Sequence, residues 1–183
     1  MIRYAVGLAI PVCRAIDGDR LRLEAMPHLE RVANEINERV NLGVMYKDRV
    51  LYLAGIEKPV LPSIYSRFGR TVPANCSSLG KAILAQYSQS QLEGFLERSP
   101  LVQQTAKSVT DRSKFIEELG RVRKQGYALD IEENALGSVC MAVPILSGGD
   151  VVGAISVSAR SYDALDGREQ ILQNAAEQIM HKL

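Results

Sequence analysis

The chain has 183 residues, of which 46% are hydrophobic and 23% are charged, as in an ordinary soluble globular protein of one domain with at most a short extension. Its formal net charge is only +1, it contains no Trp, and aromatic residues make up 5%. The chain therefore lacks the basic surface and the stacking side chains that are typical of a nucleic-acid-binding domain.

The cysteines and the N-terminal stretch indicate the compartment. Cys13, Cys76 and Cys140 are scattered and include no Cys-x-x-Cys pair, which is typical of buried thiols in a reducing environment. The apolar stretch from Tyr4 to Cys13 is too short to span a bilayer and has no signal-type cleavage site. We therefore expect a cytoplasmic protein with no membrane partner.

The first third of the chain predicts helices followed by strands. Residues 3–18 have helical spacing, and we expect them to pack on another element. Residues 27–40 predict an amphipathic helix, with Pro27 either in its first turn or at a kink of a longer helix. Three strands are expected next, the first two joined by a hairpin at Lys47-Asp-Arg49: residues 41–46, 50–54 and 60–67.

The middle of the chain carries helix-start signals. Ser77 or Ser78 can cap a helix whose apolar side is Leu79, Ala82 and Ile83. A capping box at Ser88-x-x-Gln91 predicts the start of a second helix. Asp111 precedes a third helix, which Gly126 ends and whose apolar residues are Phe115, Ile116, Leu119 and Val122. Asp166-x-x-Glu169 predicts the start of the last helix, whose apolar residues are Leu172, Ala175, Ala176, Ile179 and Leu183.

Two consecutive strands near the end of the chain predict a pocket. After a short strand at 127–132, residues 139–146 and 151–158 form a hairpin around Ser147-Gly-Gly-Asp150. Side chains alternate along a strand, so one face of this hairpin is small and polar: Cys140, Ala142, Ala154, Ser156 and Ser158. Such a face leaves room for a small polar molecule, and the absence of visible catalytic residues beside it favours a sensor.

The order of these elements predicts the fold class. Strands joined by hairpins, with helices grouped in blocks, favour an α/β protein of the α+β type, with an antiparallel sheet flanked by helices.

One catalytic alternative rests on Ser78-Leu-Gly-Lys81, which matches the Ser-x-x-Lys nucleophile motif. Its companion motifs are missing, and the simpler interpretation is a helix start followed by a solvated Lys81. A P-loop is rejected because Asn75 and Ala82 replace a required glycine and a required hydroxyl. The helix start itself has free N–H groups that can hold a carboxylate.

A second alternative is a thiol- or metal-dependent enzyme that uses Cys76 or Cys140. His28 and His181 are the only histidines, both lie on predicted helices, and no ligand cluster has the spacing of a zinc site. We therefore expect no catalytic residue, no metal and no cofactor. A Cys76- or Ser78-dependent hydrolase and a purely structural oligomerisation module stay open as alternatives.

Charged clusters are assigned by strand alternation and helical spacing. Asp130, opposite Ile131, is expected to enter the same space as the serines, whereas Glu132 and Glu133 are expected in a solvated loop. The basic run Arg121–Lys124, together with Glu117 and Glu118, predicts a solvated and paired helix face.

Five stretches, in this order and at this spacing, resemble the effector-binding domain of the IclR family of bacterial transcriptional regulators. They are Phe68-Gly-Arg-Thr-Val-Pro73, Ser77-Ser-Leu-Gly-Lys-Ala82, Arg123-Lys-Gln-Gly-Tyr-Ala-Leu-Asp-Ile-Glu-Glu133, Gly137-Ser-Val-Cys-Met-Ala142 and Ile155-Ser-Val-Ser158. The resemblance implies a GAF-like domain over residues 21–183, after a linker-helix remnant at residues 1–20. It also implies a winged helix-turn-helix domain that this chain does not include, so that Met1 begins a truncated or degenerate product.

The resemblance further implies a small organic acid or sugar acid as effector, self-association into a dimer or tetramer, and DNA binding only through the missing domain. The ligand-binding positions that match the family pocket are Leu61, Ser78, Leu79, Asp130, Cys140, Ser156 and Ser158. Three positions depart from the family pattern: Asn75 stands where His is common, and Ser78 and Leu79 stand where small residues are common. We expect Leu79 to narrow the pocket beside the carboxylate site.

Overall fold

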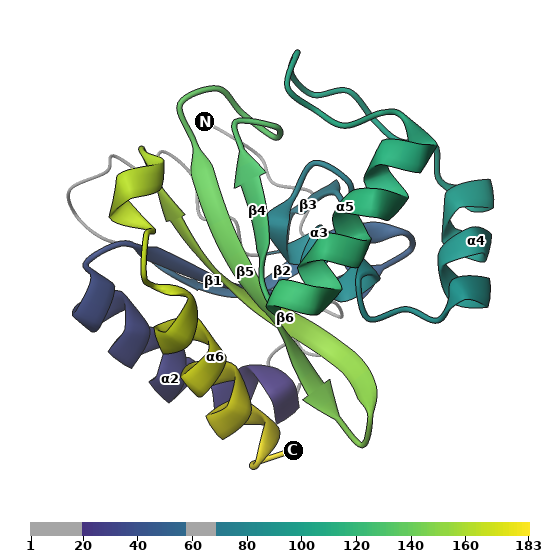
Figure 1. The fold of residues 1–183 in the computed structure, drawn as a ribbon. Coiled ribbons are helices and arrows are strands. Elements are labelled where there is room, and N and C mark those ends of the chain that lie inside the picture. Colours follow the sequence, from purple (N-terminus) through teal and green to yellow (C-terminus); the bar gives the residue numbers. More distant parts are fainter. Residues whose placement is uncertain (1–19, 58–68) are drawn as a thin grey trace, which may run out of the picture.

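The computed structural model describes residues 20–57 and 69–183, which form a sheet with helices on both faces (Figure 1). Within these residues the strands make one six-stranded sheet in the order β3-β2-β1-β6-β5-β4, and every paired neighbour is antiparallel. The strands are β1 (Arg39–Tyr46), β2 (Arg49–Ile56), β3 (Thr71–Pro73), β4 (Ala128–Ile131), β5 (Val139–Ser147) and β6 (Asp150–Ala159). The predicted α+β class is confirmed.

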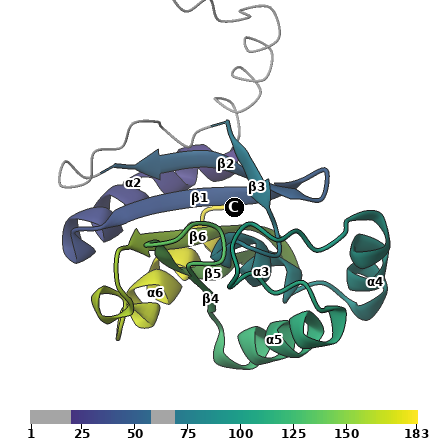
Figure 2. The same ribbon diagram turned by 90° about the horizontal axis from the view of Figure 1, so that it is seen from above.

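The helices form two layers, one on each face of the sheet. They are α2 (Arg20–Ile36), α3 (Ser78–Leu84), α4 (Gln89–Arg98), α5 (Arg112–Gln125) and α6 (Glu169–Met180), with a short 3-10 helix η1 (Tyr162–Ala164). Helices α2 and α6 lie side by side on one face of the sheet, whereas α3 and α5 cover the other face (Figures 1 and 2). The sheet thus separates two hydrophobic cores.

The alternation predicted for the last hairpin is confirmed except near the turn. A register shift between Ile145 and Leu146 places Val152 against the core with Ile155 and Val151 against the core with Ala154, the reverse of the prediction. The large apolar side chains of β5 and β6 are buried against α2 and α6, and Ala142 and Ala154 belong to the opposite core. Gly148 and Gly149 form the turn with φ angles of 61° and 91°, a region that favours glycine. The small polar face therefore points toward α3.

The first hairpin is also confirmed, because Lys47 and Asp48 both have positive φ angles, as a two-residue turn of the I′ kind requires. The third strand predicted at residues 60–67 lies outside the described residues. The structure also has a short strand β3 on the edge beside β2, which the sequence patterns did not indicate.

Most helix-start and helix-stop predictions are confirmed. Ser77 caps α3 by accepting a hydrogen bond from the N–H of Gly80, and Ser88 with Gln91 forms a complete capping box on α4. Asp111 caps α5, and Gly126 ends it with a φ of 82°. Ile116, however, is 42% exposed, because only one stripe of α5 faces the sheet.

Two helix boundaries were predicted wrongly. Helix α2 begins at Arg20 and contains Pro27, as the alternative of a longer helix predicted. Its end was predicted wrongly: it ends at Ile36, because Asn37 takes a left-handed φ of 59° and turns the chain into β1. Val40, predicted on the helix, is therefore a buried residue of β1. At the other boundary, Arg168 rather than Asp166 is the N-cap of α6, and it makes no side-chain capping bond.

Two sequence predictions bear on the N-terminal region and on membranes. The helix expected at residues 3–18 lies outside the described residues. Among the residues described, no helix has the length and apolar character that crossing a bilayer requires.

Candidate functional site

The centre of the site is a cluster of small polar side chains on the sheet face that α3 covers. In the strand register, Asp130, Cys140 and Ser158 occupy one row across β4, β5 and β6. Ser156 and Asn41 pair directly in the next row, between β6 and β1. The Oγ of Ser158 lies 3.2 Å from the Sγ of Cys140 and 3.3 Å from the Nδ2 of Asn41. We refer to Asn41, Cys140, Ser156 and Ser158 as the polar floor.

The polar floor is enclosed. Ser156 is 2% exposed, Ser158 is 5% exposed and Cys140 is 6% exposed. The three residues that the sequence placed on one face are thus together and away from bulk water.

Asp130 joins the polar floor to the loop between β4 and β5. Its Oδ1 accepts hydrogen bonds from the N–H groups of Glu133, at 2.8 Å, and Asn134, at 3.3 Å. These bonds fix the turn that follows β4. Asp130 is 3% exposed and is the register partner of Cys140. The carboxylate therefore both shapes the loop and borders the candidate site.

The start of α3 lies over the strands beside the polar floor. The first N–H groups of a helix have no partner within the helix, and Ser78 and Leu79 occupy these positions. The Leu79 side chain packs against Gly43 of β1, where an added Cβ would lie 3.0 Å from its Cδ1. Leu79 is 1% exposed. Its side chain thus belongs to the core, and only its backbone N–H is available to a ligand.

The remaining residues of the Ser78-Leu-Gly-Lys81 motif hold α3 in place. A Cβ on Gly80 would lie 2.2 Å from the carbonyl oxygen of Ala74, a distance no side chain tolerates. The absence of a side chain at Gly80 therefore lets the preceding segment cross the helix closely. The motif is explained by packing at this position.

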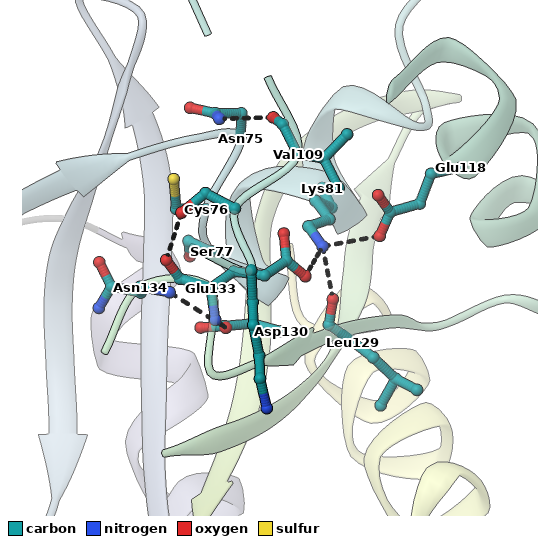
Figure 3. A network of polar contacts seen from close by, with 12 residues as sticks. Asn75, Cys76, Ser77, Lys81, Val109, Glu118, Leu129, Asp130, Glu133 and Asn134 are labelled. Carbon is teal, nitrogen blue, oxygen red and sulfur yellow. Dashed lines mark hydrogen bonds and ion pairs between the residues drawn. The ribbon is translucent and has the colours of Figure 1, made fainter. Parts of the chain in front are cut away.

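Lys81 was predicted to be solvated, and this prediction is wrong. Its side chain is fully buried, and its Nζ donates to a carboxylate oxygen of Glu133, to Oε1 of Glu118 at 2.6 Å and to the carbonyl oxygen of Leu129 at 2.9 Å (Figure 3). Glu133, also predicted to be solvated, is 7% exposed. We call Lys81, Glu118 and Glu133 the buried ion triad; it links α3 to α5 and to the β4–β5 loop.

The other charged groups behave largely as predicted. Glu132 forms an ion pair with the half-exposed Lys107, and Arg121 pairs with Glu117 on the solvated face of α5. Arg123 departs from this pattern, because its guanidinium donates to the carbonyl oxygens of Ala85 and Tyr87 after α3. It therefore joins α5 to the end of α3.

The surroundings of Lys81 and Cys76 weigh against a nucleophile. The ammonium of Lys81 is bound by three acceptors and is not available as a base for Ser78. Burial raises the pKa of the Cys76 thiol, whose Sγ donates to the carbonyl oxygen of Val102 at 3.0 Å. A nucleophilic thiol requires the opposite shift.

A pocket of about 340 Å³ opens on the same side of the sheet, next to the β4–β5 loop. It is lined by Arg49, Tyr52, Arg70, Thr71, Val72, Pro73, Gln104 and Asn134. Tyr52 pairs in register with Gly43, under Leu79, and Asn134 donates its N–H to Asp130. The pocket therefore adjoins the site from the outside. Among the described residues, no group of three or more His, Cys, Asp or Glu side chains is arranged to hold a metal ion.

Comparison with known proteins places the chain in a family. The family profile described as "Bacterial transcriptional regulator IclR C-terminal" matches residues 13–181. The chain belongs to the IclR family. The regulator XynR of Escherichia coli is 30% identical over 159 residues, which are 84% of this chain and 63% of XynR. The chain spans less than two thirds of the length of XynR and of the regulator BhcR of Paracoccus denitrificans, which it also matches.

Solved IclR structures share the fold. The C-terminal domain of the E. coli regulator KdgR has a TM-score of 0.80 and 26% identity, covering 90% of this chain and 98% of that domain. An IclR homologue from Microbacterium hydrocarbonoxydans, complexed with 4-hydroxybenzoate, has a TM-score of 0.82 and 30% identity. The match covers 90% of this chain and 68% of the homologue.

Placing the residues of the IclR resemblance in the structure separates those that meet from those that do not. Asp130, Cys140, Ser156 and Ser158 come together, with Ser78 and Leu79 at the helix start above the sheet. Leu61 lies outside the described residues. Two features were missed: the buried ion triad, whose partners are far apart in sequence, and Asn41. Strand alternation, which places Asn41 opposite Val40 and Leu42, was the signal that could have identified Asn41.

Proposed function

We propose that this chain is the effector-sensing domain of an IclR-type transcriptional regulator and that its effector is a small organic acid or sugar acid. Membership of the family supports the regulatory role. The complex of the Microbacterium homologue with 4-hydroxybenzoate supports an acid as the ligand class. The observation that carries the proposal is the buried polar floor beneath the start of α3.

The chemistry of the site suits a small acid. Free N–H groups at Ser78 and Leu79 and the positive end of the α3 dipole favour a carboxylate. The hydroxyls of Ser156 and Ser158 and the thiol of Cys140 are suited to the polar remainder of such a molecule. An apolar site with a few convergent polar groups is the usual form of a small-molecule pocket. Leu61 is proposed as a wall of this pocket.

The buried ion triad gives the sensor a route to the rest of the domain. A ligand that contacts the start of α3 acts on the same helix that carries Lys81, and therefore on α5 and the β4–β5 loop. An effector shifts a conformational equilibrium only by its difference in affinity for the two states, about 1–3 kcal/mol in typical cases. A free-energy difference of this size changes the fraction of regulator molecules that are in the binding-competent conformation.

Isothermal titration calorimetry tests the proposal with a panel of acids that includes pyruvate, gluconate and 4-hydroxybenzoate. At least one acid is expected to bind, and the double variant Ser156→Ala, Ser158→Ala should weaken that binding by tenfold or more. Ser147→Ala, at the other end of the same hairpin, is the matched control and should bind as the unchanged protein does. Undiminished affinity in the double variant contradicts the site, and no binding by any acid contradicts the function.

The remaining features of the regulator are proposals as well. We place DNA recognition in a region other than this C-terminal part, in line with the helix-turn-helix name of XynR. We propose a cytoplasmic dimer or tetramer that responds by binding and does not turn its ligand over. Size-exclusion chromatography with light scattering tests the assembly, and a monomer at micromolar concentration contradicts it.

A further inference from the structure

Asn41 is a buried carboxamide whose Oδ1 has no hydrogen-bond donor in the described part of the chain. The residue is 1% exposed, and its Nδ2 donates to the Oγ of Ser158 at 3.3 Å. No described residue donates a hydrogen bond to its Oδ1, which is itself shielded from solvent. Because buried amide oxygens in folded proteins nearly always have a partner, this one needs an explanation.

The neighbouring strand lets this oxygen lie close to its backbone. Gly55 of β2 is the register partner of Asn41, and a Cβ on Gly55 would lie 3.2 Å from Oδ1. Because Gly55 has no side chain, the carboxamide can lie against β2 without a close contact to a Cβ. The bond to Ser158 shows that the carboxamide lies on the same side of the sheet as the polar floor.

The hydrogen bonds of the polar floor determine what it can offer. The Oγ of Ser158 accepts from Asn41 and from the thiol of Cys140, so both of its lone pairs are used and its own proton remains to be donated. Asn41 Oδ1 is an acceptor only. The floor thus offers an acceptor at Asn41 beside a donor at Ser158, which is the pattern that matches a hydroxyl group.

We infer that Asn41 is a specificity-determining residue of the site, and that the effector carries a hydroxyl group whose O–H donates to Asn41 Oδ1. This inference rests on the proposed function and narrows the ligand class to hydroxy acids. Gly43, beneath Leu79 at the helix start, is the next residue of β1 on the same face, and its Cα is about 7 Å from that of Asn41. A carboxylate at the helix start and a hydroxyl at Asn41 are therefore separated by several bonds.

Matched pairs of acids test the inference by calorimetry: 4-hydroxybenzoate against benzoate, and 4-hydroxybutyrate against butyrate. The unchanged protein should bind the hydroxylated member at least tenfold more tightly, because a buried acceptor left unpaired penalises the analogue that lacks the hydroxyl. Asn41→Leu should reduce this preference to less than threefold while the affinity for the unhydroxylated acid changes little. Asn174→Leu, an exposed amide on α6, is the control and should retain the preference.

The outcomes separate the inference from the function on which it rests. Equal binding of both members of a pair by the unchanged protein overturns the inference, whether or not the Asn41 variant folds. A preference that survives in a folded Asn41→Leu variant, as judged by its thermal unfolding, also overturns it. In both cases the effector-sensing function stands, whereas the failure of every acid to bind removes the function and the inference together.

Discussion

At the scale of single residues, the buried ion triad is the feature whose removal costs most. Lys81 is fully buried and bound by two carboxylates, so Lys81→Met leaves Glu133 as a buried charge without its cation. Breaking a buried pair by removing one partner costs about 3–5 kcal/mol. We therefore expect the urea midpoint of Lys81→Met to fall far below that of the unchanged protein.

The exposed pair of Arg121 and Glu117 gives a matched control on the same side of the molecule, because both side chains are more than half exposed. Arg121→Met should leave the urea midpoint almost unchanged, since surface pairs contribute little. Burial raises the pKa of Glu133 although Lys81 opposes the shift, so the variant Lys81→Met, Glu133→Gln should recover part of the loss. Equal midpoints for Lys81→Met and Arg121→Met would contradict the role assigned to the triad.

The thiol of Cys76 gives a second prediction at this scale. Burial raises the pKa of this group, so the thiol stays protonated at neutral pH, where it donates to Val102. Iodoacetamide reacts with the thiolate. We expect mass spectrometry to find Cys76 unmodified in the folded protein at pH 7.5 and modified within minutes in urea. Rapid modification without denaturant would revive the thiol nucleophile.

At the scale of elements, the position of α3 depends on Gly80. An alanine Cβ at this position would lie 2.2 Å from the carbonyl oxygen of Ala74, and backbone atoms cannot move aside as a flexible side chain does. Gly80→Ala should therefore displace α3 from the polar floor. We expect a strong loss of stability in urea and loss of acid binding in calorimetry.

The control for this prediction is the same substitution in another helix. Gly120 lies on the exposed side of α5, and nothing lies within 4 Å of the position its Cβ would take. Alanine is favoured over glycine within a helix by up to about 1 kcal/mol. Gly120→Ala should therefore raise the urea midpoint slightly, and a comparable loss in both variants would show that packing at Ala74 is not the cause.

The contact between α2 and α6 predicts a pH dependence. Burial lowers the pKa of His28 below 6.5, Arg31 and Lys182 lower it further, and a hydrogen bond with Gln178 opposes them. The unfolded chain then binds a proton more readily than the folded one, so the contribution is present above pH 6.5 and is lost as the pH falls through the folded pKa. We expect the urea midpoint to fall between pH 7.5 and 5.5, and less so in His28→Gln. The exposed His181→Gln should keep the full decrease.

At this scale, the sequence predicted correctly most features whose signal lies within a few neighbouring residues, and it missed those that depend on distant residues. Strand alternation and helix caps act within a few residues, and they placed Cys140, Ser156 and Ser158 on one face correctly. The start of α6 failed because Gly167 takes a left-handed φ of 70° after η1, which moves the helix start beyond Asp166. The partners of Lys81 are 37 and 52 residues away, and no spacing rule connects them.

At the scale of the whole molecule, one sheet serves two cores. Except for Val151 near the turn, strands β5 and β6 contribute large apolar side chains to the α2–α6 layer and small ones to the α3–α5 layer. The sequence shows this division in the hairpin, because the two sets of side chains alternate. It does not show that α3, α5 and the β4–β5 loop share one charged network, since that requires the chain to fold back on itself.

Both helix layers pack on the same strands. Loss of the sheet would therefore expose the buried side chains of both layers at once. We therefore expect the domain to unfold in a single cooperative transition. Two probes can follow the layers separately in urea: alkylation of Cys76 reports on the α3 side, and hydrogen exchange of the α6 amides reports on the other. Both should give the same midpoint.

An acid that binds the polar floor should shift the two midpoints together, because it stabilises only the state in which both layers are folded. Midpoints that separate, or a shift confined to Cys76, would show that the layers are independent and that binding at the floor does not reach α2 and α6.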